Sequence, residues 1–155
     1  MNRRKLLLST LIFLLLEFAA SSQQTCPDGF DQVNEKCITI TSKRFTHHKA
    51  ELSCTELNAH LVFLQTAIDN TALLNYSTNI TSPMWIGVTC KVNKEPKECL
   101  WDNGSAVEYS NFLPGYPVTN IGTCVYIDSV NQPLKGRWIS ATCDFDEYHA
   151  VCEAN

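Results

Sequence analysis

Cysteine and histidine are the residue types that dominate structural zinc sites, but their spacing in this chain argues against such a site. Structural zinc sites use cysteines about two to four residues apart, and even Cys90 and Cys99 are farther apart than that. His47 and His48 are adjacent, so on a helix their side chains point in different directions. We therefore expect no metal site and no cofactor.

Hydrolytic chemistry has no motif to support it. The chain contains neither a Gly-x-Ser-x-Gly turn nor a His-Glu-x-x-His helix. Acidic residues gather near the end of the chain, in a pattern typical of a solvated turn: Asp144, Asp146 and Glu147. Alternating charges between Cys90 and Cys99 predict a solvated hairpin tip: Lys91, Lys94, Glu95, Lys97 and Glu98. We expect a protein that is not an enzyme.

The remaining chemistry of cysteine is the disulfide bond. An even number of cysteines behind an N-terminal leader is typical of a secreted domain held by disulfides. The eight cysteines are Cys26, Cys37, Cys54, Cys90, Cys99, Cys124, Cys143 and Cys152. Eight cysteines allow roughly a hundred pairings, so the residues alone leave the connectivity open.

The leader has the three parts of a secretory signal peptide. Residues 3–5 are basic, residues 6–16 are almost wholly apolar, and residues 19–22 are small. The apolar run is shorter than the ~20 residues that span a bilayer, which disfavours an uncleaved anchor. We predict a signal peptide over residues 1–22 and one secreted domain over residues 23–155.

The charge of the chain excludes two classes of partner. The net charge is −4, and the leader contributes more basic than acidic residues, so the remainder is more acidic still. An acidic domain lacks the basic surface that binds nucleic acid or an anionic membrane.

Three N-glycosylation sequons agree with export. They begin at Asn75, Asn79 and Asn103. Asn103-Gly104 is also typical of a turn. We expect at least one of the three to carry a glycan.

The elements that must position these residues change in character along the chain. A short strand is predicted over residues 37–41, a helical pattern over residues 45–64 with Thr46 or Ser42 as its N-cap, and a second helix from Thr66. Strands follow at residues 85–88, 100–101, 124–127, 137–139 and 148–152. Residues 102–123 form a long loop rich in glycine, proline and asparagine, which is a frequent place for function. Helices first and strands afterwards predict an α+β domain.

The order of these signals resembles the C-type lectin-like domain over almost all of residues 26–155. The resemblance rests on Ala59-His60-Leu61 after a helix with Cys54, on Trp85-Ile86-Gly87-Val88, and on Gly136-Arg137-Trp138 before Cys143 and Cys152-Glu153. It implies two helices, a mainly antiparallel sheet, a long loop region and four disulfides. The implied pairs are Cys54 with Cys152, Cys124 with Cys143, Cys26 with Cys37 as in the long form of the domain, and the remaining Cys90 with Cys99.

In the sugar-binding members of this family, a calcium ion held by side-chain oxygens binds the sugar hydroxyls. The family places Glu-Pro-Asn or Gln-Pro-Asp on the long loop and Trp-Asn-Asp on a later strand. The aligned residues here are Tyr116-Pro117-Val118 and Trp138-Ile139-Ser140, with Thr123 near a further ligand position. Calcium needs about six to eight oxygen ligands, so the resemblance implies that the calcium site is lost.

Without the calcium ligands, the long loop itself remains as a possible contact surface. We expect ligand contact over the loop of residues 104–122 and the adjacent strand, with these candidates: Tyr116, Pro117, Val118, Asn120 and Ser140. Tyrosine combines apolar area with a hydroxyl and is enriched at interfaces. Phe112 and Leu113 are instead expected to pin the loop to the core. Core packing is also the expectation for Trp85, Trp101 and Trp138.

These observations predict a secreted, non-catalytic recognition module that binds a carbohydrate or glycoconjugate without calcium. The alternative is a module that binds an extracellular protein and has no sugar activity. Two further alternatives are a calcium lectin with unfamiliar ligands and an enzyme. The sequence predicts no nucleic-acid partner and no membrane span, and it leaves the oligomeric state open.

Overall fold

The computed structural model describes residues 25–92 and 98–155. The predicted signal peptide, and the predicted hairpin-tip residues Lys94, Glu95 and Lys97, lie outside the described residues. The helices are α2 (His47–Thr55) and α3 (Ala67–Tyr76). The strands are β1 (Asp31–Val33), β2 (Lys36–Phe45), β3 (Ala59–Leu61), β4 (Met84–Cys90), β5 (Cys99–Trp101), β6 (Cys124–Ile127), β7 (Trp138–Ala141) and β8 (Tyr148–Ala154).

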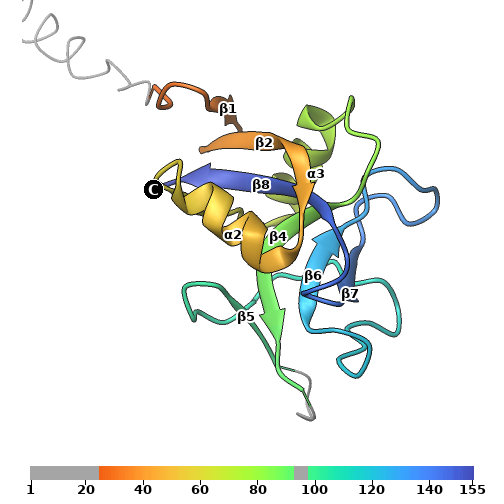
Figure 1. Ribbon diagram of the computed structural model, residues 1–155. Coiled ribbons are helices and arrows are strands. Elements are labelled where there is room, and N and C mark those ends of the chain that lie inside the picture. Colours follow the sequence, from red (N-terminus) through yellow and green to blue (C-terminus); the bar gives the residue numbers. More distant parts are fainter. Residues whose placement is uncertain (1–24, 93–97) are drawn as a thin grey trace, which may run out of the picture.

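The strands form one sheet in the order β1-β2-β8-β4-β6-β7, with β3 added on β8 and β5 on β4. Strands β4 and β8 run parallel, and the other pairs are antiparallel. Helix α2 packs on β8, and the β4–β5 hairpin extends away from this part of the fold (Figure 1). The architecture confirms the predicted α+β fold with two helices and a mainly antiparallel sheet. No helix within the described ranges is long and apolar enough to cross a membrane.

The first helix is shorter than the helical pattern in the sequence predicts. It ends at Thr55, and Asn58 takes a left-handed backbone conformation with φ 55°, which stops the helix. Residues 59–61 then pair with β8 as strand β3. The prediction of a helix to residue 64 is therefore wrong, because pairing with a buried strand overrides local helical preference.

The starts of both helices agree with the predicted caps. Thr46 is the N-cap of α2, although its side chain makes no capping hydrogen bond. Thr66 caps α3 in a full capping box: the Asp69 N–H donates to Thr66 Oγ1, and the Thr66 N–H donates to Asp69 Oδ2, both at 3.1 Å.

The core confirms the expectation for the tryptophans. Trp85 and Trp138 have no exposed surface, and Trp101 is buried. Trp138 contacts Trp101 edge-on, with ring centroids 5.9 Å apart. The Trp85 Nε1–H donates to the Phe45 carbonyl oxygen at 2.7 Å, so its polar atom is satisfied inside the core.

Four disulfides join the cysteines in the pairs that the resemblance implies: Cys26–Cys37, Cys54–Cys152, Cys90–Cys99 and Cys124–Cys143. Cys54–Cys152 ties α2 to β8 across 98 residues of chain. Closing a loop of that length stabilises a fold by about 4–5 kcal/mol in the chain-entropy model. Cys124–Cys143 ties the end of the long loop to the segment after β7.

Candidate functional site

Trp138 on β7 holds the predicted ligand loop against the core. The rings of Tyr109 and Phe112 lie edge-on to Trp138, at centroid distances of 5.7 and 5.6 Å. The Leu113 N–H donates to the Trp138 carbonyl oxygen, and the Trp138 N–H donates to the Asn111 carbonyl oxygen, both at 3.0 Å. Phe112 and Leu113 therefore pin the loop to the core, as predicted.

A polar side chain on α3 fixes Trp138 in turn. The Trp138 Nε1–H donates to Asn70 Oδ1 at 2.8 Å, and Asn70 Nδ2 donates to the Gly136 carbonyl oxygen at 3.2 Å. Asn111 Nδ2 donates to the same carbonyl at 2.7 Å. Buried hydrogen bonds of this kind make the position of the loop specific.

The five predicted contact residues divide into a surface group and a supporting group. Asn120 is exposed, and Tyr116 and Val118 are half-buried. Pro117 and Ser140 are buried, and the Val118 N–H donates to Ser140 Oγ at 2.8 Å. The structure thus brings Ser140 under the loop, where it supports the backbone and presents no surface of its own.

Ile121 belongs to the loop surface and was missed by the sequence reasoning. Its side chain is 57% exposed, and its N–H donates to the Val118 carbonyl oxygen at 3.0 Å. The next residue is necessarily glycine, because a Cβ at Gly122 would lie 1.9 Å from the Ala141 carbonyl oxygen. An exposed isoleucine beside Val118 makes this end of the loop apolar, and only the fold tells which side of it faces solvent.

The first part of the same loop borders a small cleft. Its volume is about 270 Å³, and its lining residues are Gln65, Trp101, Ser105, Ala106, Glu108 and Tyr109. This is below the ~300–1,000 Å³ of pockets for drug-sized ligands. The lining offers amide, hydroxyl and carboxylate groups next to aromatic rings, which is a suitable surface for a single polar ring such as a sugar.

The positions at which the family resemblance implies calcium ligands do not fit the ion. Val118 and Ile139 have no side-chain oxygen, and Ser140 Oγ already accepts a hydrogen bond while buried. The Thr123 hydroxyl lies 3.3 Å from Cys143 Sγ and donates to it, since a disulfide sulfur carries no proton. These residues cannot supply the about six to eight oxygens that calcium needs.

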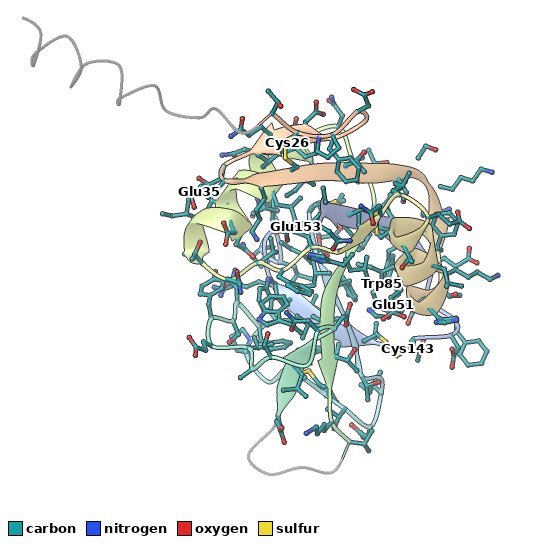
Figure 2. All side chains as sticks on the ribbon, turned by 90° about the vertical axis from the view of Figure 1, so that its left-hand side faces the viewer. Cys26, Glu35, Glu51, Trp85, Cys143 and Glu153 are labelled. Atoms are coloured by element: carbon teal, nitrogen blue, oxygen red, sulfur yellow. A yellow bond between two sulfur atoms is a disulfide. The ribbon has the colours of Figure 1, made fainter. Side chains whose placement is uncertain are left out.

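A second group of polar residues is formed where α2 meets the turn after β5. One ligand atom each from His47, Glu51 and Asp102 lie within 4.8 Å of one another. His47 and Glu51 are four residues apart on α2 and share one helix face, and Figure 2 labels Glu51 on this helix. Asp102 follows β5, and its N–H donates to the Gly87 carbonyl oxygen at 3.0 Å.

Burial dominates the electrostatics of this cluster. It lowers the pKa of His47, which the nearby Glu51 carboxylate partly opposes. It also raises the pKa of Asp102 to about 7, with repulsion from Glu51 as the second cause and a hydrogen bond from Thr89 opposing both. Asp102 as a whole residue remains exposed, so it is the region around its carboxyl group that is poorly hydrated.

The helical spacing of His47 and Glu51 is the only signal of this cluster in the sequence. Asp102 lies about fifty residues further along the chain, and no sequence pattern predicts that it lies close to His47 and Glu51. The adjacent His48 differs from His47 in burial, because its side chain is largely exposed. Its Nδ1 atom nevertheless lies 3.5 Å from the same Glu51 Oε2, so the prediction that the two histidines diverge holds for their exposure and not for their approach to Glu51.

The sequon asparagines Asn75, Asn79 and Asn103 are all exposed. Asn103 Oδ1 accepts hydrogen bonds from the Ser105 N–H at 2.9 Å and from the Ser105 hydroxyl at 2.7 Å. All three are accessible to a glycosyltransferase, and their occupancy stays a prediction.

Comparison with known proteins gives a consistent result. The family model for the lectin C-type domain matches residues 43–154. The low affinity immunoglobulin epsilon Fc receptor of Homo sapiens is 30% identical over 132 residues, which are 83% of this chain and 38% of the receptor. The chain spans less than two fifths of the length of the curated relatives it matches.

Two solved structures show the same fold at low identity. One is the cow C-type carbohydrate-recognition domain of CD23 in the presence of GlcNAc2Man3 oligosaccharide, with 24% identity and a TM-score of 0.69. The other is a calcium-independent type II antifreeze protein, with 20% identity and a TM-score of 0.70. Each match covers 83% of this chain, with 95% of the first structure and 93% of the second.

Proposed function

The chain belongs to the lectin C-type domain family, and on that premise we propose that it is a secreted, non-catalytic module that binds a carbohydrate or glycoconjugate without calcium. The ligand surface is the loop over residues 104–122. Four disulfides suit an extracellular domain.

The observation that carries the proposal is the Ser140–Val118 hydrogen bond. A buried serine hydroxyl that accepts from the loop backbone at 2.8 Å holds the loop in place with no ion at that position. Elsewhere in the family a calcium ion connects loop and strand, and here a direct hydrogen bond makes the connection. This hydrogen bond supports a loop surface that needs no calcium for its preorganisation.

The polar cleft at the start of the loop supports a sugar ligand. Ser105, Glu108 and Gln65 offer hydrogen-bonding groups, and Tyr109 borders the cleft with an aromatic ring. Sugars are recognised by such a combination, because their hydroxyls need partners while their C–H faces pack on rings. The similarity to a domain solved with an oligosaccharide is in line with this ligand class.

The experiment is a glycan array probed with the purified protein in EDTA, followed by calorimetry with the strongest glycan. Binding that survives EDTA is the expected result. Glu108→Gln and Tyr116→Ala should each weaken that binding at least about tenfold, with the melting temperature changed by less than about 2 °C. Ile68→Ser, at an exposed position on α3, is the matched control and should change neither quantity.

Binding that requires calcium would overturn the proposal. If Tyr116→Ala instead unfolds the domain, Tyr116 belongs to the core and the loop loses its contact role.

A protein partner is the second candidate, and Ile121 favours it. An isoleucine that is 57% exposed, and whose N–H donates to the carbonyl oxygen of the half-buried Val118, gives an apolar contact surface. The same array separates the two candidates: silence on every glycan, with the protein folded, favours a protein partner.

A further inference from the structure

We propose that His47, Glu51 and Asp102 bind a divalent transition-metal cation of the zinc type. The site is separate from the loop over residues 104–122, and it goes beyond the recognition function proposed above. It also differs from the expectation, drawn from the spacing of histidines and cysteines, that the chain has no metal site.

The first argument is the convergence of three potential ligand atoms from two segments that are distant in the chain. One imidazole nitrogen and two carboxylate oxygens lie within 4.8 Å of one another. The Nδ1 atom of His47 is 3.9 Å from Oε2 of Glu51. Zinc bonds of about 2.0–2.2 Å place tetrahedral ligands roughly 3.5 Å apart, so side-chain movements on the order of 1 Å complete the geometry.

The second argument is a buried polar atom without a partner. His47 is 3% exposed, and its Nε2 atom forms no hydrogen bond within the described residues, while its Nδ1 atom is the ring nitrogen that lies toward Glu51. Burying an imidazole nitrogen without a partner costs about 1–3 kcal/mol, which proteins rarely tolerate without a reason. The edge contact with Trp85, at a centroid distance of 5.2 Å, fixes the ring beside the two carboxylates.

The third argument is charge. Two carboxylates share one small region, and in the described part of the chain neither forms an ion pair with a lysine or arginine. Like charges at this separation repel strongly in a poorly hydrated region. A divalent cation between them converts the repulsion into attraction.

The donor set indicates which cation. An imidazole nitrogen with two carboxylate oxygens suits zinc and its neighbours in the transition series, whereas calcium and magnesium prefer oxygen ligands alone. Three protein ligands leave a fourth position for water, as in open zinc sites.

Solvent can reach the site from one side. Asp102 lines an open cleft of about 440 Å³ together with His60, Phe63, Asn103 and Asn155. Glu51 is half-exposed. The cation can therefore enter from solvent, while the buried imidazole holds it from the core side. A bound ion would tie the start of α2 to the turn after β5, two segments that no disulfide joins.

The test uses the purified protein with its disulfides formed, stripped of metal with EDTA and then dialysed. Zinc is titrated by calorimetry, and thermal melting is followed with zinc, calcium or magnesium in excess. Cobalt(II) provides a second readout, because its visible absorption reports a tetrahedral site. We expect one zinc ion per chain and a rise in melting temperature on the order of 5–10 °C at a hundredfold excess over Kd. Calcium and magnesium should give no shift.

Variants of the three proposed ligands test whether zinc binds at this site. Glu51→Gln and Asp102→Asn preserve shape and should each weaken zinc binding at least about tenfold, because even an outer partner of a metal ligand costs about 10- to 100-fold. His47→Gln should abolish the cobalt spectrum. Because His47 is buried and its substitution also disturbs the packing of α2, the two carboxylate variants decide the test. His48→Gln is the matched control: it neighbours the same carboxylate from an exposed position and should leave the affinity unchanged.

Three outcomes would overturn the proposal. The first is no saturable zinc binding. The second is zinc binding that both carboxylate variants leave unchanged. The third is calcium binding at least as tight as zinc binding and equally sensitive to Asp102→Asn.

Discussion

Asn70 is the residue whose loss should reveal how the long loop is held. Asn70→Ala removes the acceptor of the Trp138 Nε1–H, which lies 2.8 Å away in a region with no exposed tryptophan surface. An unsatisfied buried donor costs about 1–3 kcal/mol, and the lost packing of the amide adds up to about 1 kcal/mol. The Gly136 carbonyl oxygen loses its bond from Asn70 but keeps the one from Asn111 at 2.7 Å, so it adds little.

The expected destabilisation is therefore about 2–4 kcal/mol. For a domain of this size that corresponds to a fall in melting temperature of roughly 10 °C. The assay is urea unfolding with the disulfides intact, followed by tryptophan fluorescence. Thr71→Ala is the control on the same helix, because its exposed hydroxyl bonds only within the helix, to the Ala67 carbonyl oxygen, and it should cost under about 0.5 kcal/mol.

A double-mutant cycle isolates the interaction itself. Trp138→Phe removes the donor, so Asn70→Ala in that background should cost less than it does alone, by about 1–3 kcal/mol. A loss below about 1 kcal/mol for Asn70→Ala in the natural background, or strict additivity in the cycle, would refute the reasoning that this hydrogen bond fixes Trp138.

Two further predictions follow from single positions. Gly122→Ala places a Cβ 1.9 Å from the Ala141 carbonyl oxygen, so it should lower the free energy of unfolding by at least about 3 kcal/mol or prevent recovery of folded protein. A loss of under about 1 kcal/mol in urea unfolding would contradict this. Burial raises the pKa of Tyr76 to about 12, and the second cause is the hydrogen bond that its hydroxyl donates to Asp31 at 2.7 Å. The folded state then holds the proton more tightly than the unfolded state, so this contribution is complete below pH 10 and is lost as the pH rises from about 10 to 12. Tyr76→Phe should flatten that part of the stability–pH curve, and an unchanged slope would show that the hydroxyl is not the group responsible.

Most strands were predictable because their signal is local. Residues 124–127 alternate apolar and β-branched types between turn residues, and β6 has those same bounds. The capping box at Thr66 and Asp69 is likewise readable within four residues of sequence. Strand β3 was missed because three residues carry too little pattern, and only pairing with β8 makes them a strand.

The candidate site was predictable in part. The position of the proposed ligand loop followed from the family resemblance, and so did the replacement of the calcium ligands at Val118 and Ile139. Its surface did not follow, because exposure depends on how the loop folds back: Ser140 lies beneath it and Ile121 on top. From the sequence alone, Ser140 and Ile121 cannot be divided into a buried residue and an exposed one.

The sequence by itself determined the disulfide-bonded character of the domain and its α+β class, and the family resemblance added that residues without a side-chain oxygen stand at calcium-ligand positions. These depend on which residue types are present and on their order, and both are local properties. The tertiary structure alone decided that His47 and Glu51 meet Asp102 and that Asn70 reaches Trp138. Such contacts join residues some fifty to seventy positions apart, and their distance is set by the packing of whole elements, which no spacing in the chain encodes.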